Sequence, residues 1–290
     1  MTMSAAASGR FTIGGDLTIS RLGFGAMRVT GPGVWGPPED KEAARDVVRR
    51  VVELGIDLID TADSYGPHVS EDLIAEALYP YPEGLLVATK GGLERTGPGE
   101  WPRNGRPEHL RNACEGSLRR LRVERIDLYQ LHSPDSDVPY AESVGALKEL
   151  QDEGKIGHVG ISNVTLAQLE QARRIVDVVT VQNRFNLTDR TSAEVLEECG
   201  REGLGFFPWF PLAAGDLARP GGLVDEIAAN HDATPGQIAL AWLLARSRVM
   251  LPIPGTSSIE HLEENVAAAQ LELNEEELER LDASADAPRA

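Results

Sequence analysis

Short apolar runs that alternate with helix-like segments set the strongest limit on how this chain can fold. Eight such runs are short enough for strands, and each is followed by a segment whose apolar residues recur at helical spacing. This order predicts an α/β protein with parallel strands, and eight units of it are typical of a (β/α)8 TIM barrel. An open doubly wound sheet is the alternative. The expected strands are residues 22–26, 56–59, 85–89, 126–131, 156–161, 178–182, 204–208 and 249–252.

The two ends of the chain add elements outside this repeat. Residues 11–19 predict an N-terminal β-hairpin, and residues 274–282 predict a C-terminal helix. Asn274 followed by Glu277 is a capping-box spacing, which favours a helix start at that point. Nearer the N-terminus, Ser70 is expected to be the N-cap of the helix that follows the second strand.

Composition narrows the class of protein. The 290 residues carry a formal net charge of −18, which argues against nucleic acid and anionic membrane surfaces as partners. Two cysteines without metal-type spacing predict neither a disulfide scaffold nor a metal site, and they fit a reducing cytoplasm. No linker divides the chain, so we expect a flexible tail at residues 1–9 and a single barrel domain at residues 10–290.

Ionisable side chains stand where three of the expected strands end. Asp60 closes the second strand and lies five residues before Tyr65, Lys90 closes the third, and His132 closes the fourth. A barrel collects the carboxyl ends of its strands on one face, where catalytic residues sit. Each residue alone is compatible with a structural role, but together they indicate proton transfer to a carbonyl oxygen. The chemistry that this set favours is carbonyl reduction.

One glycine-rich motif is misleading. Residues 31–36 spell G-x-G-x-x-G, but two prolines follow directly and no helix opens there, so we interpret the segment as a loop and not as a dinucleotide fingerprint. Its aromatic residue, Trp35, is a candidate wall of a substrate pocket.

Several motifs, in order along the chain, resemble the aldo-keto reductase family over residues 11–282. They are Asp-Thr-Ala-Asp-Ser-Tyr-Gly (60–66), Ala-Thr-Lys (88–90), Leu-His-Ser-Pro-Asp (131–135), Gly-Ile-Ser-Asn (160–163), Val-Gln-Asn (181–183), Pro-Leu-Ala (211–213) and Ile-Pro-Gly-Thr-Ser-Ser (253–258). The resemblance implies a catalytic tetrad of Asp60, Tyr65, Lys90 and His132. In it Tyr65 would be the proton donor, made more acidic by Lys90, while Asp60 would hold Lys90 and His132 would polarise the carbonyl.

The same resemblance implies a nicotinamide cofactor, because no side chain can donate a hydride. Ser162, Asn163 and Gln182 would hold the carboxamide, and Trp209 would stack on the nicotinamide. Many family members clamp the 2′-phosphate of NADPH with a lysine and an arginine, where this chain has Gly255 and His261. We therefore expect NADPH rather than NADH, held by a weaker clamp. The full set expected to bind it is Gly25, Ala26, Met27, Asp60, Ser162, Asn163, Gln182, Trp209, Phe210, Pro211, Leu212, Ala213, Gly215, Gly255, Thr256, Ser257, His261, Glu264 and Asn265.

The substrate implied is a small carbonyl compound. Within the family, residues 31–38, 65–69, 77–81 and 253–262 are most similar to pyridoxal reductases (pyridoxine 4-dehydrogenases), which implies reduction of pyridoxal to pyridoxine. The alternative hypothesis is a cofactor-binding regulatory subunit that resembles the potassium-channel β subunits. The sequence leaves the oligomeric state open.

Overall fold

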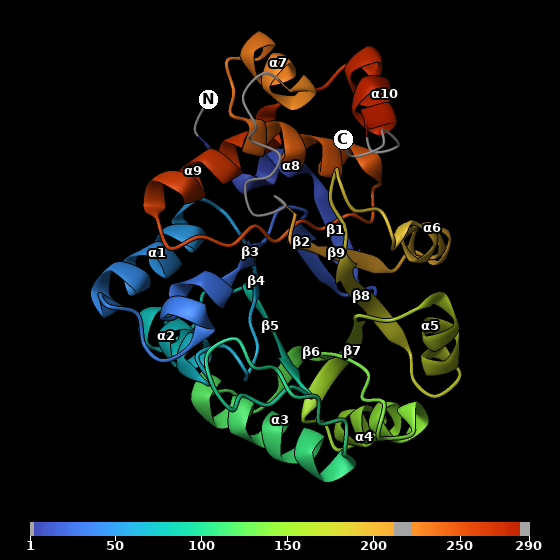
Figure 1. Ribbon diagram of the computed structural model, residues 1–290. Coiled ribbons are helices and arrows are strands. Elements are labelled where there is room, and N and C mark those ends of the chain that lie inside the picture. The colour runs from blue at the N-terminus through green and yellow to red at the C-terminus, as the bar shows by residue number, and fades with distance from the viewer. Residues whose placement is uncertain (1–2, 212–221, 285–290) are drawn as a thin grey trace.

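A parallel sheet forms the centre of the molecule, in a computed structural model that describes residues 3–211 and 222–284. Within these residues seven strands pair in chain order, β3 through β9, and every pairing is parallel. The helices surround the strands (Figure 1), as the strand–helix order predicts for a barrel. The strands are β3 (Phe24–Gly25), β4 (Leu58–Asp60), β5 (Leu86–Gly91), β6 (Ile126–Leu131), β7 (Ile156–Ser162), β8 (Val178–Arg184) and β9 (Gly205–Trp209).

The expected eighth strand closes the barrel without forming a regular ladder. On one side, Phe206 N donates to Val249 O at 2.8 Å and Leu251 N donates to Phe206 O at 2.8 Å. On the other side, Gly23 N donates to Pro252 O at 2.9 Å. The segment contains Pro252 and Pro254, which have no N–H to donate, and its only β pairing within the described residues is one isolated bridge to Phe206. The fold is therefore a (β/α)8 barrel whose last strand is irregular.

The helices begin where the sequence offers capping side chains. Asp40 accepts from the amides of Glu42 and Ala43 at the start of α1, and Thr165 and Thr234 form capping boxes at α5 and α8. Their apolar faces pack on the strands and leave polar faces to solvent. The helices are α1 (Lys41–Glu53), α2 (Val69–Leu78), α3 (Pro107–Leu121), α4 (Tyr140–Asp152), α5 (Leu166–Arg173), α6 (Ala193–Glu202), α7 (Leu223–Asn230), α8 (Pro235–Arg246), α9 (Ile259–Ala267) and α10 (Glu275–Ser284). None of these helices is both long and apolar enough to cross a bilayer.

The N-terminal hairpin covers one end of the barrel. Strands β1 (Arg10–Ile13) and β2 (Leu17–Ser20) pair antiparallel, as expected. Ile13 and Ile19 are buried in one cluster with residues at the beginnings of the barrel strands, among them Leu58 and Leu86. The amino ends of the strands are thus plugged by the hairpin, which leaves the carboxyl ends as the open face.

Two local expectations are wrong. Residues 5–8, expected as part of a flexible tail, form a 3-10 helix in which Ala5 is buried and Ser8 Oγ accepts from Leu22 N at 3.0 Å. Ser70 is not the N-cap of α2, because that helix begins at Val69 and His68 occupies the N-cap position. Ser70 is buried, and its hydroxyl donates to the Ala26 carbonyl while accepting from Thr61. The expected capping box of α10 is present, with Asn274 and Glu277 each bonding the other's backbone N–H at 3.0 Å.

Candidate active site

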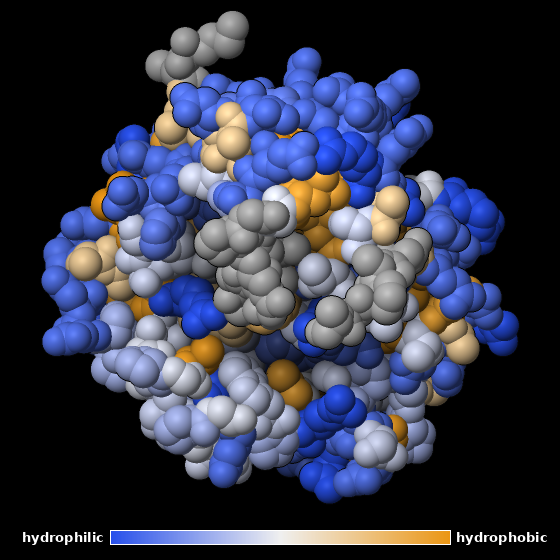
Figure 2. Space-filling model, turned by 45° about the horizontal axis from the view of Figure 1, so that its top comes forward, coloured by the Kyte–Doolittle hydropathy of each residue, from blue (hydrophilic) through white to orange (hydrophobic). Residues whose placement is uncertain are grey.

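A large cavity opens on the face formed by the carboxyl ends of the strands. Its volume is about 1010 Å³, enough for a dinucleotide and a small substrate together. In Figure 2 a hollow lies near the middle of the visible face, among hydrophilic and hydrophobic residues. The residues that line the cavity are Gly25, Met27, Arg28, Asp60, Tyr65, Leu93, Trp101, Arg103, His132, Ser133, Ser162, Asn163, Gln182, Trp209, Phe210, Pro211, Ile253, Pro254, Gly255 and His261.

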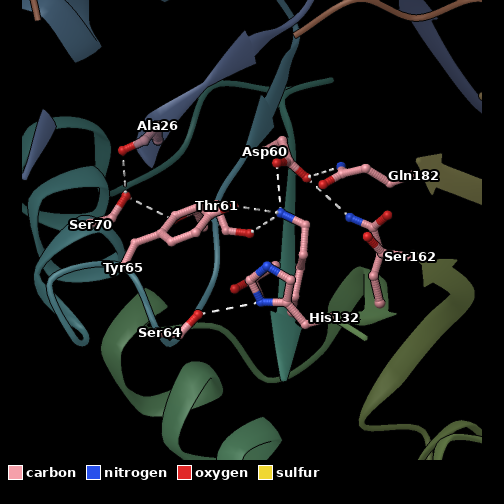
Figure 3. A network of polar contacts seen from close by, with 12 residues as sticks. Ala26, Asp60, Thr61, Ser64, Tyr65, Ser70, His132, Ser162 and Gln182 are labelled. Atoms are coloured by element: carbon pink, nitrogen blue, oxygen red, sulfur yellow. Dashed lines mark hydrogen bonds and ion pairs between the residues drawn. The ribbon is translucent and has the colours of Figure 1, made fainter. Parts of the chain in front are cut away.

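The four residues predicted to act in catalysis meet beside this cavity, and we refer to them as the lysine cluster (Asp60, Tyr65, Lys90 and His132). Lys90 Nζ contacts Asp60 Oδ2 at 2.7 Å and Tyr65 Oη at 3.5 Å (Figure 3). The Tyr65 and His132 rings meet edge to face with centroids 5.8 Å apart. Asp60 ends β4, Lys90 lies near the end of β5, and His132 follows β6, so the parallel topology brings them together.

Lys90 is buried and fully partnered. Its side chain has 0% exposure, and besides Asp60 and Tyr65 it donates to Thr61 O at 2.8 Å. Burial lowers the pKa of Lys90, but Asp60 and Tyr65 raise it by more, so the net pKa lies above its usual value. The ammonium therefore stays charged across physiological pH. A buried charge persists only when it is paired and hydrogen-bonded, and Asp60 supplies that pairing.

Asp60 is itself held by two amides that come from other strands. Gln130 Nε2 donates to its Oδ1 at 3.1 Å and Gln182 Nε2 donates to the same atom at 3.0 Å. The second contact uses the amide nitrogen of Gln182, which leaves its Oε1 for a ligand in the cavity. Gln130 was not predicted, because a glutamine inside an apolar strand gives no distinctive signal.

Opposing influences set the pKa of Tyr65. Burial raises the pKa of the phenol, and although Lys90 lowers it, the nearby Asp60 and Asp63 carboxylates raise it again, so the net pKa is above 10. Lys90 thus lowers the pKa of the phenol, as predicted, but burial and the two carboxyl groups together outweigh it. Burial wins because the phenolate loses its hydration, whereas the lysine charge is shared with Asp60.

His132 is neutral in this site. Burial first, and Lys90 second, hold its pKa well below the usual value of 6.5. Ser64 Oγ lies 3.3 Å from Nδ1 (Figure 3). When that serine donates, the ring hydrogen is on Nε2, and a neutral imidazole can then donate to a ligand oxygen in the cavity.

Polar residues at the ends of β7 and β8 border the opposite wall of the cavity. Asn163 Nδ2 donates to His132 O at 2.9 Å and to Ser162 Oγ at 3.0 Å, which leaves the Ser162 hydroxyl hydrogen free to donate. Trp209 Nε1 donates to Asn163 Oδ1 at 3.0 Å, so the indole orientation is set by a hydrogen bond. Ser162 as donor and Gln182 Oε1 as acceptor are the two groups that a carboxamide requires.

A second region of the cavity, the Gly255 end (Arg28, Gly255 and His261), is exposed. Gly255 approaches β3 so closely that a Cβ there would lie 2.6 Å from Gly25 O and 3.6 Å from the Arg28 side chain. Ser258 Oγ accepts from His261 N at the start of α9, a helix whose N-terminus points its amides at this region. Arg28 was not predicted, yet it brings a positive charge to the place where this chain has Gly255 and His261 instead of the family's lysine and arginine.

Some predicted residues lie elsewhere. Trp35 does not line the cavity, because its backbone pairs with Gly66 and its ring packs near Arg95, and the aromatic wall is Trp101 instead. Four expected cofactor residues, Ala26, Thr256, Glu264 and Asn265, are likewise not lining residues, and neither is the exposed Ser257. The predictions at Leu212, Ala213 and Gly215 fall outside the described residues. No group of three or more His, Cys, Asp or Glu side chains suited to a metal occurs in ranges 3–211 and 222–284.

The comparisons with known proteins agree with this geometry. The sequence profile of the aldo/keto reductase family matches residues 21–286. An uncharacterized oxidoreductase of Schizosaccharomyces pombe is 52% identical over 92% of this chain and 87% of its own, and the pyridoxine 4-dehydrogenase of Escherichia coli is 41% identical over 95% and 98%. An aldo-keto reductase of Klebsiella pneumoniae, solved in complex with NADPH, superposes with a TM-score of 0.82 at 26% identity, covering 100% of this chain and 98% of that one. The chain therefore belongs to the aldo/keto reductase family.

Proposed function

We propose that this protein reduces an aldehyde or ketone to an alcohol with NADPH, that Tyr65 is the proton donor, and that pyridoxal is a substrate. The observation that supports this most is the contact of 3.5 Å between Lys90 Nζ and Tyr65 Oη beside the cavity. A phenol next to a buried ammonium can release its proton to an alkoxide, because the phenolate left behind is stabilised by the positive charge.

Each residue of the lysine cluster has a separate task in this proposal. Neutral His132 donates a hydrogen bond to the carbonyl oxygen and polarises it. Tyr65 then donates its proton to that oxygen as negative charge develops there. Lys90 stabilises the Tyr65 phenolate, and Asp60 keeps Lys90 charged and oriented through their 2.7 Å ion pair. The raised pKa of Tyr65 keeps the proton on the phenol until negative charge develops on the carbonyl oxygen.

The cofactor would supply the hydride when bound. Ser162 and Gln182 are suited to bind its carboxamide, and the Trp209 indole, fixed by Asn163, is suited to contact the nicotinamide ring. At the Gly255 end, the amides at the start of α9, the Arg28 guanidinium and the His261 side chain suit a phosphate, which favours NADPH over NADH. The Klebsiella pneumoniae relative solved with NADPH supports the same choice.

Pyridoxal is proposed because of the 41% identical pyridoxine 4-dehydrogenase relative and the loop similarities described above.

We also propose a cytoplasmic setting, since both cysteines, Cys114 and Cys199, are free and buried, as suits a reducing compartment.

The test is an assay of NADPH oxidation with a panel of aldehydes and ketones that includes pyridoxal, monitored by loss of NADPH absorbance. The proposal expects turnover with several aldehydes, turnover with pyridoxal, and a higher kcat/KM with NADPH than with NADH. Binding of NADPH without turnover of any carbonyl would contradict the enzymatic assignment. Turnover of other aldehydes but not of pyridoxal would contradict only the substrate.

A further inference from the structure

The loop at residues 92–106, between β5 and α3, builds one wall of the cavity, and Arg95 holds that loop in place. The Arg95 guanidinium donates to Val34 O at 2.7 Å and to Ser64 O at 3.1 Å, which belong to the two preceding strand–helix loops. Its Nε donates to Glu100 O at 2.9 Å within its own loop. One side chain thus ties three loops together through backbone carbonyls. Because the acceptors are backbone carbonyls, the anchor depends on Arg95 and not on the side chains of the two loops that it binds.

Arg95 also fixes the orientation of Trp101. The guanidinium carbon lies 3.7 Å from the centroid of the Trp101 ring, a close cation–π stack. The same indole meets the Tyr65 ring edge to face, with centroids 6.3 Å apart and an interplanar angle of 83°. A flat, immobilised aromatic surface therefore stands directly beside the phenol that we propose as proton donor. A planar aromatic substrate can pack against it with little loss of conformational freedom.

Arg103 gives this wall a positive charge. Its backbone pairs with Leu93 across the loop, and its exposed side chain lines the cavity. Arg103 forms no ion pair or side-chain hydrogen bond with any residue in ranges 3–211 and 222–284. The carboxylate that feels its charge is Asp135, but both Asp135 oxygens already accept backbone N–H groups, from Gly105 and Asp137, each at 2.9 Å. The guanidinium is thus available to a ligand.

We propose that the wall formed by Leu93, Trp101 and Arg103 selects aromatic aldehydes that carry an anionic oxygen, with Trp101 packing on the ring and Arg103 binding the anion. This inference rests on the proposed function, since it assigns the substrate class of the same site. An arginine pairs with carboxylate, phenolate or phosphate through charge-assisted hydrogen bonds, so the shared chemistry is an anionic oxygen on the ring system. Pyridoxal, a flat heteroaromatic aldehyde with an acidic ring hydroxyl, belongs to this class.

The test compares two aldehydes of similar size that differ in charge, 4-carboxybenzaldehyde and its methyl ester, in the full-length protein with saturating NADPH. The measured quantity is the ratio of kcat/KM for the acid to kcat/KM for the ester. In Arg103→Gln this ratio is expected to fall about tenfold, mainly through KM for the acid, because one charge-assisted contact is lost. The matched control is Arg106→Gln, which removes another exposed arginine near Asp135 that does not line the cavity. Its ratio is expected to stay within about twofold of the native value, as a screened surface charge should.

A ratio that is unchanged in Arg103→Gln, or that falls equally in Arg106→Gln, would overturn the proposal. Trp101→Leu separates the two parts of the wall: it is expected to lower kcat/KM for both aromatic aldehydes about equally and to leave their ratio near the native value. If the acid-to-ester ratio fell as far in Trp101→Leu as in Arg103→Gln, the loop as a whole, and not Arg103, would be responsible for discriminating the substrates by charge.

A binding measurement keeps this inference separate from the proposed function. The probe is 4-(hydroxymethyl)benzoate, the alcohol expected from the acid, titrated into protein saturated with NADP⁺ and followed by tryptophan fluorescence. Its Kd is expected to rise about tenfold in Arg103→Gln and to change little in Arg106→Gln. This outcome does not depend on turnover, so a protein that reduced no aldehyde would contradict the proposed function while the charged wall was still tested. An equal Kd in native protein and Arg103→Gln would contradict the wall.

Discussion

The two regions of the cavity use charge in opposite ways. In the lysine cluster every charge is buried: the Lys90 side chain is 0% exposed and has Asp60, Tyr65 and Thr61 as partners. At the Gly255 end, Arg28 and His261 are exposed. Charges in a low-dielectric interior interact strongly and set one another's protonation, whereas exposed charges are screened by water and salt. Changes in the first region should therefore have large effects on chemistry and stability, and changes in the second should have modest effects on cofactor choice.

The largest expected effect is that of Tyr65→Phe. Removing the hydroxyl eliminates the proposed proton donor, so kcat should fall by roughly 100- to 10,000-fold. The Kd for NADPH, measured by quenching of tryptophan fluorescence, should change little, because Tyr65 is proposed to contact the substrate carbonyl and is not among the residues expected to bind the cofactor. Near-native turnover in this variant would disprove the role of Tyr65 and with it the contrast between the two regions.

The burial of the cluster predicts a large effect on stability. Lys90→Met leaves the Asp60 carboxylate buried without its cation, and the free energy of unfolding in urea should fall by about 3 kcal/mol. The control is Lys148→Met, which breaks the exposed Lys148–Asp152 ion pair and should cost at most about 1 kcal/mol. Adding Asp60→Asn to Lys90→Met should recover part of the loss. Equal losses for Lys90→Met and Lys148→Met would mean that burial is not what distinguishes the cluster.

The exposed end should respond on the scale of a single surface contact. His261→Arg places a guanidinium where the family commonly has one. The ratio of kcat/KM for NADPH to that for NADH should rise roughly tenfold, which corresponds to about 1–2 kcal/mol for one charge-assisted contact. The gain should shrink as salt is added, because these groups are exposed. Ile259→Arg is the control, since it adds the same charge two residues earlier in α9, at a position that does not line the cavity. If both variants changed the ratio equally, general electrostatic attraction would explain the effect instead of a contact with the 2′-phosphate.

The smallest effect concerns pH. The pKa of His132 is held well below 6.5 in the folded protein, so as pH falls through 6.5 the unfolded chain binds a proton that the folded protein does not. The His132 contribution is therefore favourable above pH 6.5 and is lost as pH falls below it. Between pH 7.5 and 5.5 the native protein should lose about 1 kcal/mol more unfolding free energy than His132→Asn. Identical pH dependence in the two proteins would show that His132 titrates normally and is not desolvated by the cluster.

The lysine cluster and the loop residues that line the cavity differ in how well they could be predicted from the sequence. Asp60, Lys90 and His132 were identified as a group because strand order alone brings the carboxyl ends of parallel strands together. Arg28, Trp101 and Arg103 were missed, because loop residues follow no periodic pattern that indicates which side chain faces the cavity. Trp35 was expected as the pocket aromatic and Trp101 was not, and what distinguishes them is the folded cavity, which Trp101 lines and Trp35 does not.

The sequence by itself determined the barrel, its capped helices and hairpin, and the residue types available for carbonyl chemistry, because these follow from local periodicity and from the topology of parallel strands. Only the tertiary structure decided the protonation states and the shape of the pocket. The pKa of Tyr65 rises although Lys90 is beside it, and that balance depends on how completely the phenol is removed from water. The eighth strand likewise closes the barrel through Gly23 and Phe206, contacts that no local pattern around its prolines contains. Burial and long-range contact are properties of the packed molecule, and a linear pattern cannot specify them.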